Sequence, residues 1–253
     1  MIDRASGLPA YRQVADELRK KINAGEYRPG DKLPSERVLV DTYQVSRITI
    51  REAVGLLRAE GLVSAEHGKG VFIRPPQKVE RLSRSRLSRA ARSAGQAAFL
   101  ADAASNRFTP AVEVDIRVEA ATTEVAQVLG IGEGDEVLVR ERVMSADGQP
   151  IQLATSRLPR SITAGTAIEQ TDTGPGGTYA RLEEAGHTLA HFSETVGARM
   201  PTPDEASLLR LGAGTPILVV RRVAVDTEGA AVEVNDMRLA GDRYELAYEF
   251  PAD

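Results

Sequence analysis

Residues 33–62 read LPSERVLVDTYQVSRITIREAVGLLRAEGL, and this stretch contains the signals for two short helices separated by a tight turn. Ser35 and Ser46 are good N-cap residues, because a serine hydroxyl accepts a hydrogen bond from an unsatisfied amide of the first helical turn. We therefore predict one helix over about 36–43 and a second over about 47–60. Two short helices joined in this way are typical of a helix-turn-helix.

A third helix is expected in front of this pair, over residues 11–24. Val14, Leu18 and Ile22 recur every four residues, which places them on one face of a helix. Gly25 follows them and is a suitable C-terminal cap, because glycine readily adopts the left-handed conformation that ends many helices. The apolar face can therefore pack against the other two helices.

A β-hairpin is expected after the three helices, because residues 62–65 and 71–74 have the alternation of paired strands. Between them, Gly68 and Gly70 allow positive φ and a close backbone approach to a phosphate or a minor groove, and Lys69 adds a cation. Three helices and such a wing form a winged helix-turn-helix, a DNA-binding fold. Each piece alone is as typical of a solvated helix or an ordinary turn, so their order carries the prediction.

Three arginines lie on one side of the second helix of the pair. At 100° per residue, Arg47, Arg51 and Arg58 fall within a stripe about 40° wide. In a helix-turn-helix the side chains at the start of this recognition helix enter the major groove. The arrangement therefore favours contact with duplex DNA.

Residues 8–74 resemble the DNA-binding domain of the GntR family of regulators. Four stretches carry the resemblance: LPSER at 33–37, VSRITIR at 45–51, LRAEGL at 57–62 and GKG at 68–70. The resemblance implies that these stretches supply the base and phosphate contacts. The candidate residues are Ser35, Arg37, Ser46, Arg47, Thr49, Arg51, Gly68, Lys69 and Gly70.

The resemblance implies different roles for these candidates. Arg47 and Arg51 are expected to read guanine, with roughly 1–3 kcal/mol of discrimination for each bidentate contact. The serine and threonine hydroxyls are expected to bind phosphates, and the backbone of Gly68 to reach the minor groove. Glu66 departs from the pattern, since related wings often carry a basic residue there, and it is expected to weaken nonspecific attraction to phosphate.

Charge is distributed unevenly along the chain, although the net charge is only −4. Basic side chains exceed acidic ones by three in residues 1–76 and by five in 77–107, whereas acidic ones exceed basic ones by twelve in 108–253. A basic N-terminal part joined to an acidic C-terminal part indicates that only the first contacts a polyanion. Chance drift in surface charge is the alternative.

Composition excludes several classes of protein. The 253 residues are 42% hydrophobic and 27% charged, as in globular proteins, and no run of 18 apolar residues predicts a membrane-spanning helix. Cysteine is absent, which excludes disulfides, thiolate zinc sites and a cysteine nucleophile. The first residues, Met1-Ile2-Asp3-Arg4, contain no secretory signal, so we expect a cytoplasmic protein without membrane contact.

We predict a mixed α/β chain of two domains: a winged helix-turn-helix over residues 1–76, a basic linker over 77–107 and an effector-binding and dimerisation domain over 108–253. The linker is rich in Arg, Ser and Ala. It is interpreted as a solvated, partly helical hinge. The alternative is a segment that contacts the DNA backbone or becomes ordered when an effector binds.

The C-terminal domain contains an internal repeat. A shift of 80 residues aligns several apolar residues and glycines, and it also aligns Arg142 with Arg222. Each copy has a threonine cap (Thr122 or Thr202), a short amphipathic helix, a Gly-x-Gly turn and two strands joined by a turn. Two copies predict a pseudo-twofold α+β domain built on a central antiparallel sheet.

Roughly residues 95–250 resemble the UTRA effector domain of the HutC branch of GntR regulators, which shares its fold with chorismate lyase and binds small metabolites. The resemblance implies effector contacts from Arg142, Tyr179 and Glu233. Arg142 and Tyr179 match the residues that hold phosphate in the branch that senses phosphorylated amino sugars. Arg142 also has a physical rationale, because a strand arginine is a natural clamp for an anion; an ion pair with a local acid is the alternative.

Other polar contacts of that branch are missing here. Met144, Ala154, Gly177 and Leu239 stand where the resemblance implies an arginine, a glutamate, a serine and a tyrosine. These replacements remove hydrogen bonds without supplying others. We therefore expect a less polar small-molecule effector that carries a carboxylate or another anion, and not an amino-sugar phosphate.

No catalytic site, metal site or cofactor is expected. His187 and His191 are four residues apart, but no third ligand and no metalloprotease glutamate accompanies them. The favoured function is a metabolite-responsive repressor that binds a double-stranded DNA operator as a homodimer, because one head alone reads too few bases. The alternatives are a ligand-independent regulator with a vestigial pocket and a lyase-like enzyme.

Overall fold

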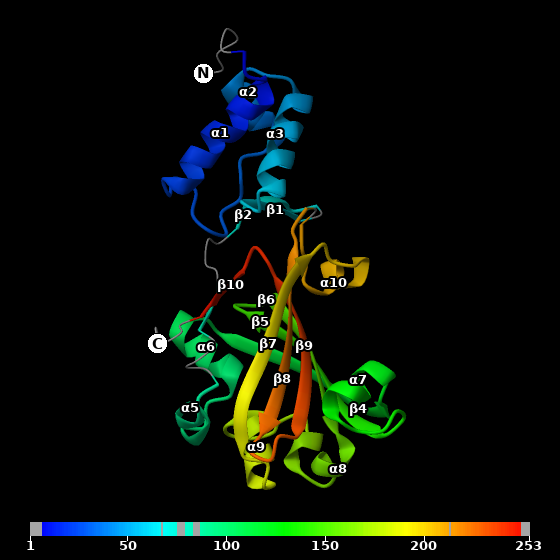
Figure 1. Cartoon of the computed structure of the whole chain (residues 1–253). Coiled ribbons are helices and arrows are strands. Elements are labelled where there is room, and N and C mark those ends of the chain that lie inside the picture. The colour runs from blue at the N-terminus through cyan, green and yellow to red at the C-terminus, as the bar shows by residue number, and fades with distance from the viewer. Residues whose placement is uncertain (1–6, 67, 75–78, 83–86, 213, 249–253) are drawn as a thin grey trace, which may run out of the picture. The chain divides into compact units, whose positions relative to one another are not determined.

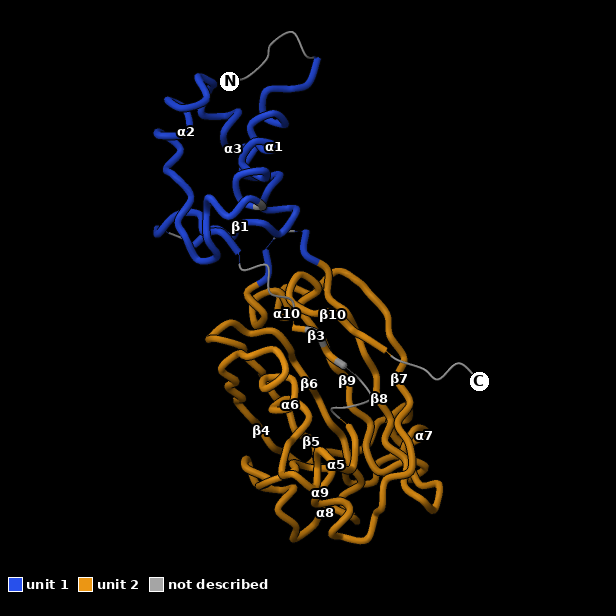
Figure 2. The backbone as a smooth tube through the Cα atoms, turned by 90° about the vertical axis from the view of Figure 1, so that its left-hand side faces the viewer, with its two compact units in different colours: residues 1–77, 211–215 blue, residues 78–210, 216–253 orange. Residues whose placement is uncertain are grey.

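The computed structural model describes residues 7–66, 68–74, 79–82, 87–212 and 214–248 (Figure 1). The chain divides into two compact units, which have different colours in Figure 2. The first unit contains residues 1–77 with 211–215, and the second contains residues 78–210 with 216–253. Among the described residues, no helix combines the length and the apolar character needed to cross a bilayer.

The first unit contains three helices and a β-hairpin. Their bounds are α1 Ala10–Asn23, α2 Glu36–Tyr43, α3 Arg47–Ala59, β1 Val63–Glu66 and β2 Gly70–Ile73. The two strands pair antiparallel, from Val63 opposite Ile73 to Glu66 opposite Gly70. The predicted winged helix-turn-helix is therefore confirmed.

Serine caps and a common core explain why these residues form this unit. Ser35 Oγ accepts from the Val38 amide at 3.4 Å, and Ser46 Oγ accepts from the Thr49 amide at 3.1 Å. Gln44, between α2 and α3, has a φ of 53°, the left-handed conformation that ends a helix and turns the chain. The buried core comprises Val14, Ala15, Leu18, Leu33, Leu39, Tyr43, Ile50, Ala53, Leu57, Val63 and Ile73.

The second unit is built on a sheet of antiparallel strands in the order β4-β5-β6-β9-β8-β7. Their bounds are β4 Pro110–Ala120, β5 Glu136–Ala146, β6 Gln149–Pro159, β7 Leu189–Arg199, β8 Ile217–Asp226 and β9 Ala231–Ala240. β6 and β9 form the central pair, so three consecutive strands lie on each side of the middle of the sheet.

The two halves of this sheet are the two copies of the sequence repeat. The first copy is β4, α7 (Thr123–Leu129), β5 and β6; the second is β7, α10 (Pro203–Leu208), β8 and β9. Thr122 Oγ1 accepts from the Val125 amide and Thr202 Oγ1 accepts from the Glu205 amide, so both threonine caps form. The predicted α+β domain on a central antiparallel sheet is confirmed, with the same connectivity in each half.

Different elements cover the two faces of the sheet. On one face, α6 (Ala98–Asn106), β3 (Val79–Leu82) and β10 (Tyr244–Ala247) cover the Phe99 cluster, which includes Phe99, Met144, Ala154, Met237 and Leu239. Farther along that face, the short helix η1 (Ala167–Glu169) and α9 (Gly177–Glu184) cover the Leu182 cluster, which includes Leu138, Leu158, Ile168 and Leu182. α7 packs on the opposite face, and the short helix α8 spans Arg160–Thr163.

The described part of residues 77–107 is partly helical, as expected, but several of its side chains are buried, so it is not a solvated hinge. β3 pairs parallel with β10, and α5 (Arg89–Ser93) and α6 pack within the second unit. Arg81 and Arg92 are buried because each meets a carboxylate, Glu194 and Glu183 respectively. Residues 77, 78 and 83–86 of the expected linker lie outside the described residues.

Candidate DNA-binding surface and effector site

The first two turns of α3 present two exposed arginines beside the start of α2. Arg51 Nε lies 2.9 Å from Glu36 Oε1, and Arg47 Nε lies 3.8 Å from Glu36 Oε2. Both arginine side chains are 63% exposed. The hydrogen bond from Arg51 holds the pKa of Glu36 below its usual range, so this glutamate is ionised and both guanidiniums turn to one side of the motif.

These ion pairs are too weak to keep the arginines from another ligand. Exposed pairs contribute about 0–1 kcal/mol, whereas a bidentate contact to guanine contributes roughly 1–3 kcal/mol of discrimination. Arg47 and Arg51 can therefore exchange Glu36 for a base edge or a phosphate. Arg37, on the next residue of α2, is also exposed.

The hydroxyl groups expected to bind phosphates are already the caps of the two helices. Ser46 Oγ, besides its bond from the Thr49 amide, lies 2.9 Å from Thr49 Oγ1. Ser35 Oγ serves the start of α2 in the same manner. A hydroxyl can still donate its proton to a phosphate while its lone pairs accept from an amide, so capping does not remove the expected role.

The wing has two glycines with positive φ, and its lysine forms an ion pair with Glu66. Gly68 has a φ of 73° and Gly70 a φ of 125°, and a Cβ on Gly70 would lie 2.5 Å from the Cε of Lys32. Lys69 Nζ lies 3.2 Å from Glu66 Oε2, with 74% of the lysine side chain exposed. Glu66, the residue that departs from the family pattern, therefore pairs with Lys69, and its carboxylate offsets the positive charge of that lysine at the tip of the wing.

Sequence reasoning missed one feature of this surface. Ile48 is 70% exposed, directly after Arg47 at the start of α3, and Val38 on α2 is 46% exposed. A large exposed aliphatic side chain beside groove-reading arginines is suited to contact with the methyl group of thymine. The available signal was the position itself, because Ile48 lies off the apolar stripe that Ile50, Ala53 and Leu57 form.

A row of buried polar side chains crosses the covered face of the large sheet. Arg140, Ser156, Asn235, Arg222 and Glu194 occupy opposed positions on β5, β6, β9, β8 and β7. We call these five residues the polar row. It lies between the Phe99 cluster and the Leu182 cluster, so its groups are removed from water over nearly their whole surface.

Tyr179 and Glu233, two of the predicted effector residues, meet beside the polar row. Tyr179 Oη on α9 donates to Glu233 Oε2 on β9 at 2.6 Å, and Glu233 is 1% exposed. Burial and the neighbouring carboxylate raise the pKa of the Tyr179 phenol, which therefore keeps its proton. The structure thus brings together two residues that are 54 positions apart in the sequence.

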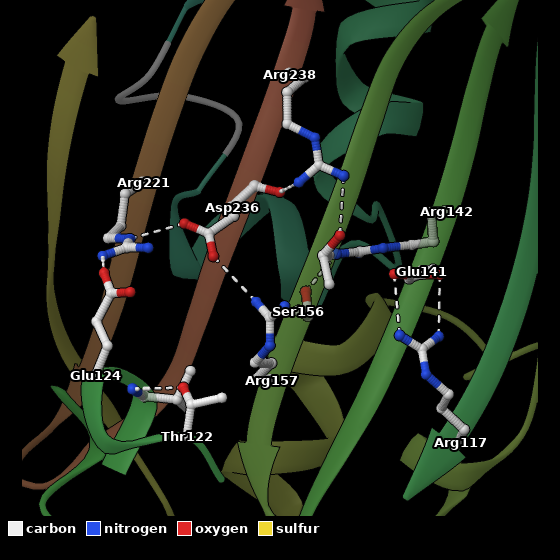
Figure 3. Close-up of polar contacts among 12 residues, drawn as sticks. Arg117, Thr122, Glu124, Glu141, Arg142, Ser156, Arg157, Arg221, Asp236 and Arg238 are labelled. Carbon is white, nitrogen blue, oxygen red and sulfur yellow. Dashed lines mark hydrogen bonds and ion pairs between the residues drawn. The ribbon is translucent and has the colours of Figure 1, made fainter. Parts of the chain in front are cut away.

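Arg142, the third predicted effector residue, lies on β5 two positions after Arg140. Its Nη2 donates to Ser156 Oγ, so the guanidinium reaches into the polar row (Figure 3). The same register that places Arg142 opposite Ala154 places Arg222 opposite Asn235 in the second repeat. The two aligned arginines therefore approach the middle of the sheet from opposite sides.

Arg140 was not singled out from the sequence, yet it is the most deeply buried cation of the first repeat. It donates to the carbonyl oxygens of Ile168, Gln170 and Thr171, and burial followed by the charge of Arg142 lowers its pKa to about 10. Its Nε has no hydrogen-bond partner. Its spacing of two from Arg142 was the available signal, since alternate residues of a strand share a face.

Two further buried polar atoms on the same face of the sheet as Arg140 have no hydrogen bond. They are Asn235 Oδ1 and Gln152 Oε1, on side chains that are 5% and 2% exposed. Buried polar atoms are almost always satisfied in folded proteins, by protein, water or ligand. A donor and two acceptors without a hydrogen bond therefore lie on one face of the sheet, which makes this face a candidate ligand site.

The opposite face of the sheet carries a separate network of ion pairs. Asp236 accepts from Arg157 at 3.0 Å and from Arg221 at 2.7 Å, and Arg117 binds Glu141 (Figure 3). These charges are paired with one another and partly exposed. We therefore interpret the network as a set of partly solvated ion pairs that link neighbouring strands of the sheet.

His187 and His191 lie on different parts of the second unit, and His187 forms a hydrogen bond with a carboxylate. His187 Nδ1 lies 3.0 Å from Asp226 Oδ2, and His191 lies on β7. The described part of the chain contains no group of three or more potential metal ligands.

Two family models match the two units. Residues 10–73 match the model described as bacterial regulatory proteins of the gntR family, and residues 109–245 match the UTRA domain. Among solved structures, PhnF from Mycobacterium smegmatis matches with a TM-score of 0.61 and 26% identity, over 95% of this chain and 100% of that one.

Curated relatives match over nearly the full length. An uncharacterised HTH-type transcriptional regulator of Streptomyces coelicolor is 32% identical, covering 96% of this chain and 93% of the relative. The HTH-type transcriptional repressor NagR of Bacillus subtilis is 27% identical, covering 98% and 97%. These relatives are transcriptional regulators and not enzymes. The chain belongs to the GntR family of bacterial regulatory proteins with a UTRA domain, and it is a DNA-binding transcriptional regulator.

Proposed function

We propose that this chain is a repressor of the HutC type that acts as a homodimer and releases its operator when an anionic small molecule binds the second unit. The exposed arginines of α3 support operator reading by Arg47 and Arg51. Two regulators named as repressors support the repressor role: in sequence alignments, NagR is 27% identical over 98% of this chain and PhnF is 29% identical over 92% of it.

Homodimer formation follows from the size of the reading surface. One recognition helix and one wing contact only a few base pairs, whereas a genome offers millions of competing sites. Two heads on a two-fold operator multiply the discrimination of one head. We assign the dimer contact to the C-terminal domain, residues 108–253, which the acidic balance keeps away from DNA.

The observation that carries the effector proposal is the burial of Arg140, which is 3% exposed and lies two positions from Arg142 on the same face of β5. Burial and the neighbouring charge of Arg142 both disfavour the charged guanidinium and lower the pKa of Arg140. An anion placed between Arg140 and Arg142 relieves that cost, while Tyr179 and Glu233 orient the rest of the molecule. We therefore assign effector contacts to Arg142, Tyr179 and Glu233 and add Arg140.

The side chains around these groups define the remainder of the effector. Met144, Ala154 and Leu239 are buried in the Phe99 cluster and offer only apolar surface. A sugar ring would leave its hydroxyls without partners there, at about 1–3 kcal/mol for each. The site is suited to an anion with an apolar body, such as a carboxylic acid, and not to an amino-sugar phosphate.

Release of the operator requires that the effector binds two arrangements of the dimer with different affinity. We propose that the liganded arrangement sets the two heads at a separation that no longer matches the half-sites. A tenfold loss of operator affinity then needs about 1.4 kcal/mol of preference for that arrangement.

Thermal unfolding across a metabolite collection tests the effector assignment. Hydrophobic carboxylic acids are expected to raise the melting temperature of the wild type and to weaken its operator binding in a mobility-shift titration. Arg142→Leu should abolish both effects. Stabilisation by a hexosamine phosphate would overturn the effector class, and operator binding that no cell extract alters would favour a ligand-independent regulator.

A further inference from the structure

We infer that Glu194 is a positioning residue that couples the effector site to β3, the strand on which the chain continues after the DNA-binding unit. The inference rests on the proposed effector response and adds its route. In the sequence, β3 begins at Val79, two residues after position 77, where the first unit ends.

Two arginines converge on one oxygen of Glu194. Arg222 Nε and Nη2 donate to Glu194 Oε1 at 2.8 and 2.6 Å, and Arg81 Nη2 donates to the same oxygen. Arg81 is 0% exposed and Arg222 is 2% exposed. Charged hydrogen bonds are strong in such an environment, and a carboxylate oxygen has two lone pairs for three donors. A change in the hydrogen bonds from one arginine to Glu194 Oε1 therefore alters the hydrogen bond from the other.

The second oxygen of Glu194 binds the same small strand pair. Tyr248 Oη donates to Glu194 Oε2 at 2.9 Å, and Tyr248 directly follows β10. Arg81 lies on β3, which pairs with β10 from Val79 opposite Tyr244 onward. Glu194 on β7 thus ties both strands of the pair to the edge of the large sheet.

Arg222 connects this tie to the effector site. The charge of Arg222 also acts on the Tyr179 hydroxyl, because both side chains pack against the Phe192 ring: its centre lies 5.9 Å from the Arg222 guanidinium carbon and 5.0 Å from the centre of the Tyr179 ring. The Tyr179 hydroxyl in turn donates to Glu233 at 2.6 Å. The interactions therefore run from Glu233 through Tyr179, Arg222 and Glu194 to Arg81. Each member is a charged or phenolic side chain, so a shift at one end changes the electrostatic balance along the whole series.

The shared oxygen fixes the direction of the effect. An anionic effector that draws Arg222 toward itself leaves Glu194 Oε1 to Arg81, so β3 is held more firmly. Loss of the Tyr179 hydroxyl removes a polar group that competes with Glu194 for Arg222, so Arg222 binds Glu194 more tightly and the interaction of Glu194 with Arg81 weakens.

Hydrogen–deuterium exchange of the ligand-free full-length protein tests this series. Glu194→Gln should speed amide exchange in β3 and β10 about tenfold relative to the central strands β6 and β9 of the same molecule. Tyr179→Phe, which is conservative and lies on another element, should speed it roughly threefold or more. In the Glu194→Gln background, Tyr179→Phe should have no further effect on β3.

Asp236→Asn is the matched control, because Asp236 also accepts from two arginines but on the opposite face. It should leave the exchange of β3 relative to β6 unchanged. Unchanged exchange in Tyr179→Phe, or a uniform rise over the whole second unit, would overturn the inference. Because no ligand is used, this result is independent of the effector screen. If amide exchange in β3 is faster in the variants but the screen finds no active metabolite, the proposed effector response is contradicted and the series of contacts is not.

Discussion

We expect Arg47 to be the side chain on which sequence reading by this regulator most directly depends. Its guanidinium is exposed and only loosely held, 3.8 Å from Glu36, so it is free to contact a base edge. Arg47→Ala should cost roughly 1–3 kcal/mol on the best operator and much less on a scrambled duplex. Binding isotherms on both duplexes measure the difference.

Lys69 is proposed as the contrast to Arg47, because we expect this wing lysine to contact phosphate and not base edges. Lys69→Ala should weaken binding to every duplex by a similar factor and reduce the slope of log affinity against log salt by about one unit. A loss confined to the operator would contradict the phosphate role of the wing.

Glu36 is expected to restrain DNA binding. Its carboxylate pairs with both groove-facing arginines, and Arg51 lowers its pKa, so it stays ionised well into the acidic range. Glu36→Gln should raise affinity for operator and scrambled duplexes alike. In the wild type, protonation should give that gain only at a pH below the usual carboxyl range. A titration at neutral pH that shows no gain for the variant would contradict this role.

At the scale of single residues, the sequence predicted side chains that contact near neighbours in the chain. It missed side chains whose partners are distant in the sequence. The caps Ser35 and Ser46 follow from helix-start chemistry and form as expected. The contact of Tyr179 with Glu233 needed the family resemblance. Arg81 reads as a solvated residue in an arginine-rich segment, because nothing local reveals that β7 brings a carboxylate to it.

At the scale of elements, α10 gives a prediction about pH. Glu205 closes a capping box with Thr202 and binds Arg199, and these contacts lower its pKa from 4.5 to about 2. A carboxylate with a lowered pKa contributes stability above its unfolded pKa and loses it as pH falls toward its folded pKa. Glu205→Gln should therefore lower the free energy of unfolding by about 1–2 kcal/mol at pH 7, with a smaller difference near pH 2.

Urea unfolding of the full chain at several pH values measures this difference. Asp204→Asn is a matched control, because Asp204 occupies the same first turn but is exposed and only complements the helix dipole. Its effect should be a few tenths of a kcal/mol. An equal loss for both variants would show that the charge of the first turn matters and the capping box does not.

The packing of the elements within the expected linker, residues 77–107, could not be predicted from the sequence. Its composition is that of a solvated segment, and composition is the only signal that one sequence offers for a connection. Phe99 and Arg92 are buried in it through contacts with the sheet and with Glu183, more than 80 residues away in the sequence. Long-range pairing of this kind cannot be predicted from local periodicity.

At the scale of the whole molecule, the repeat was the most informative signal. A shift of 80 residues in the sequence becomes two halves of one sheet, joined by β6 and β9 at its centre. This arrangement places Arg142 and Arg222 in equivalent positions, and only the second has acquired Glu194 as a partner. We propose that this asymmetry leaves Arg142 to the effector and commits Arg222 to the connection with β3.

Operator geometry tests the proposed homodimer as a whole. If two heads bind together, an insertion of about five base pairs, half a helical turn, between the half-sites should turn one head away from its groove. Affinity should then fall to that of a duplex with one scrambled half-site. The comparison needs three duplexes of equal length: intact, inserted and half-scrambled. A monomeric regulator would bind the inserted duplex as tightly as the intact one, because a single head does not sense the separation of the half-sites.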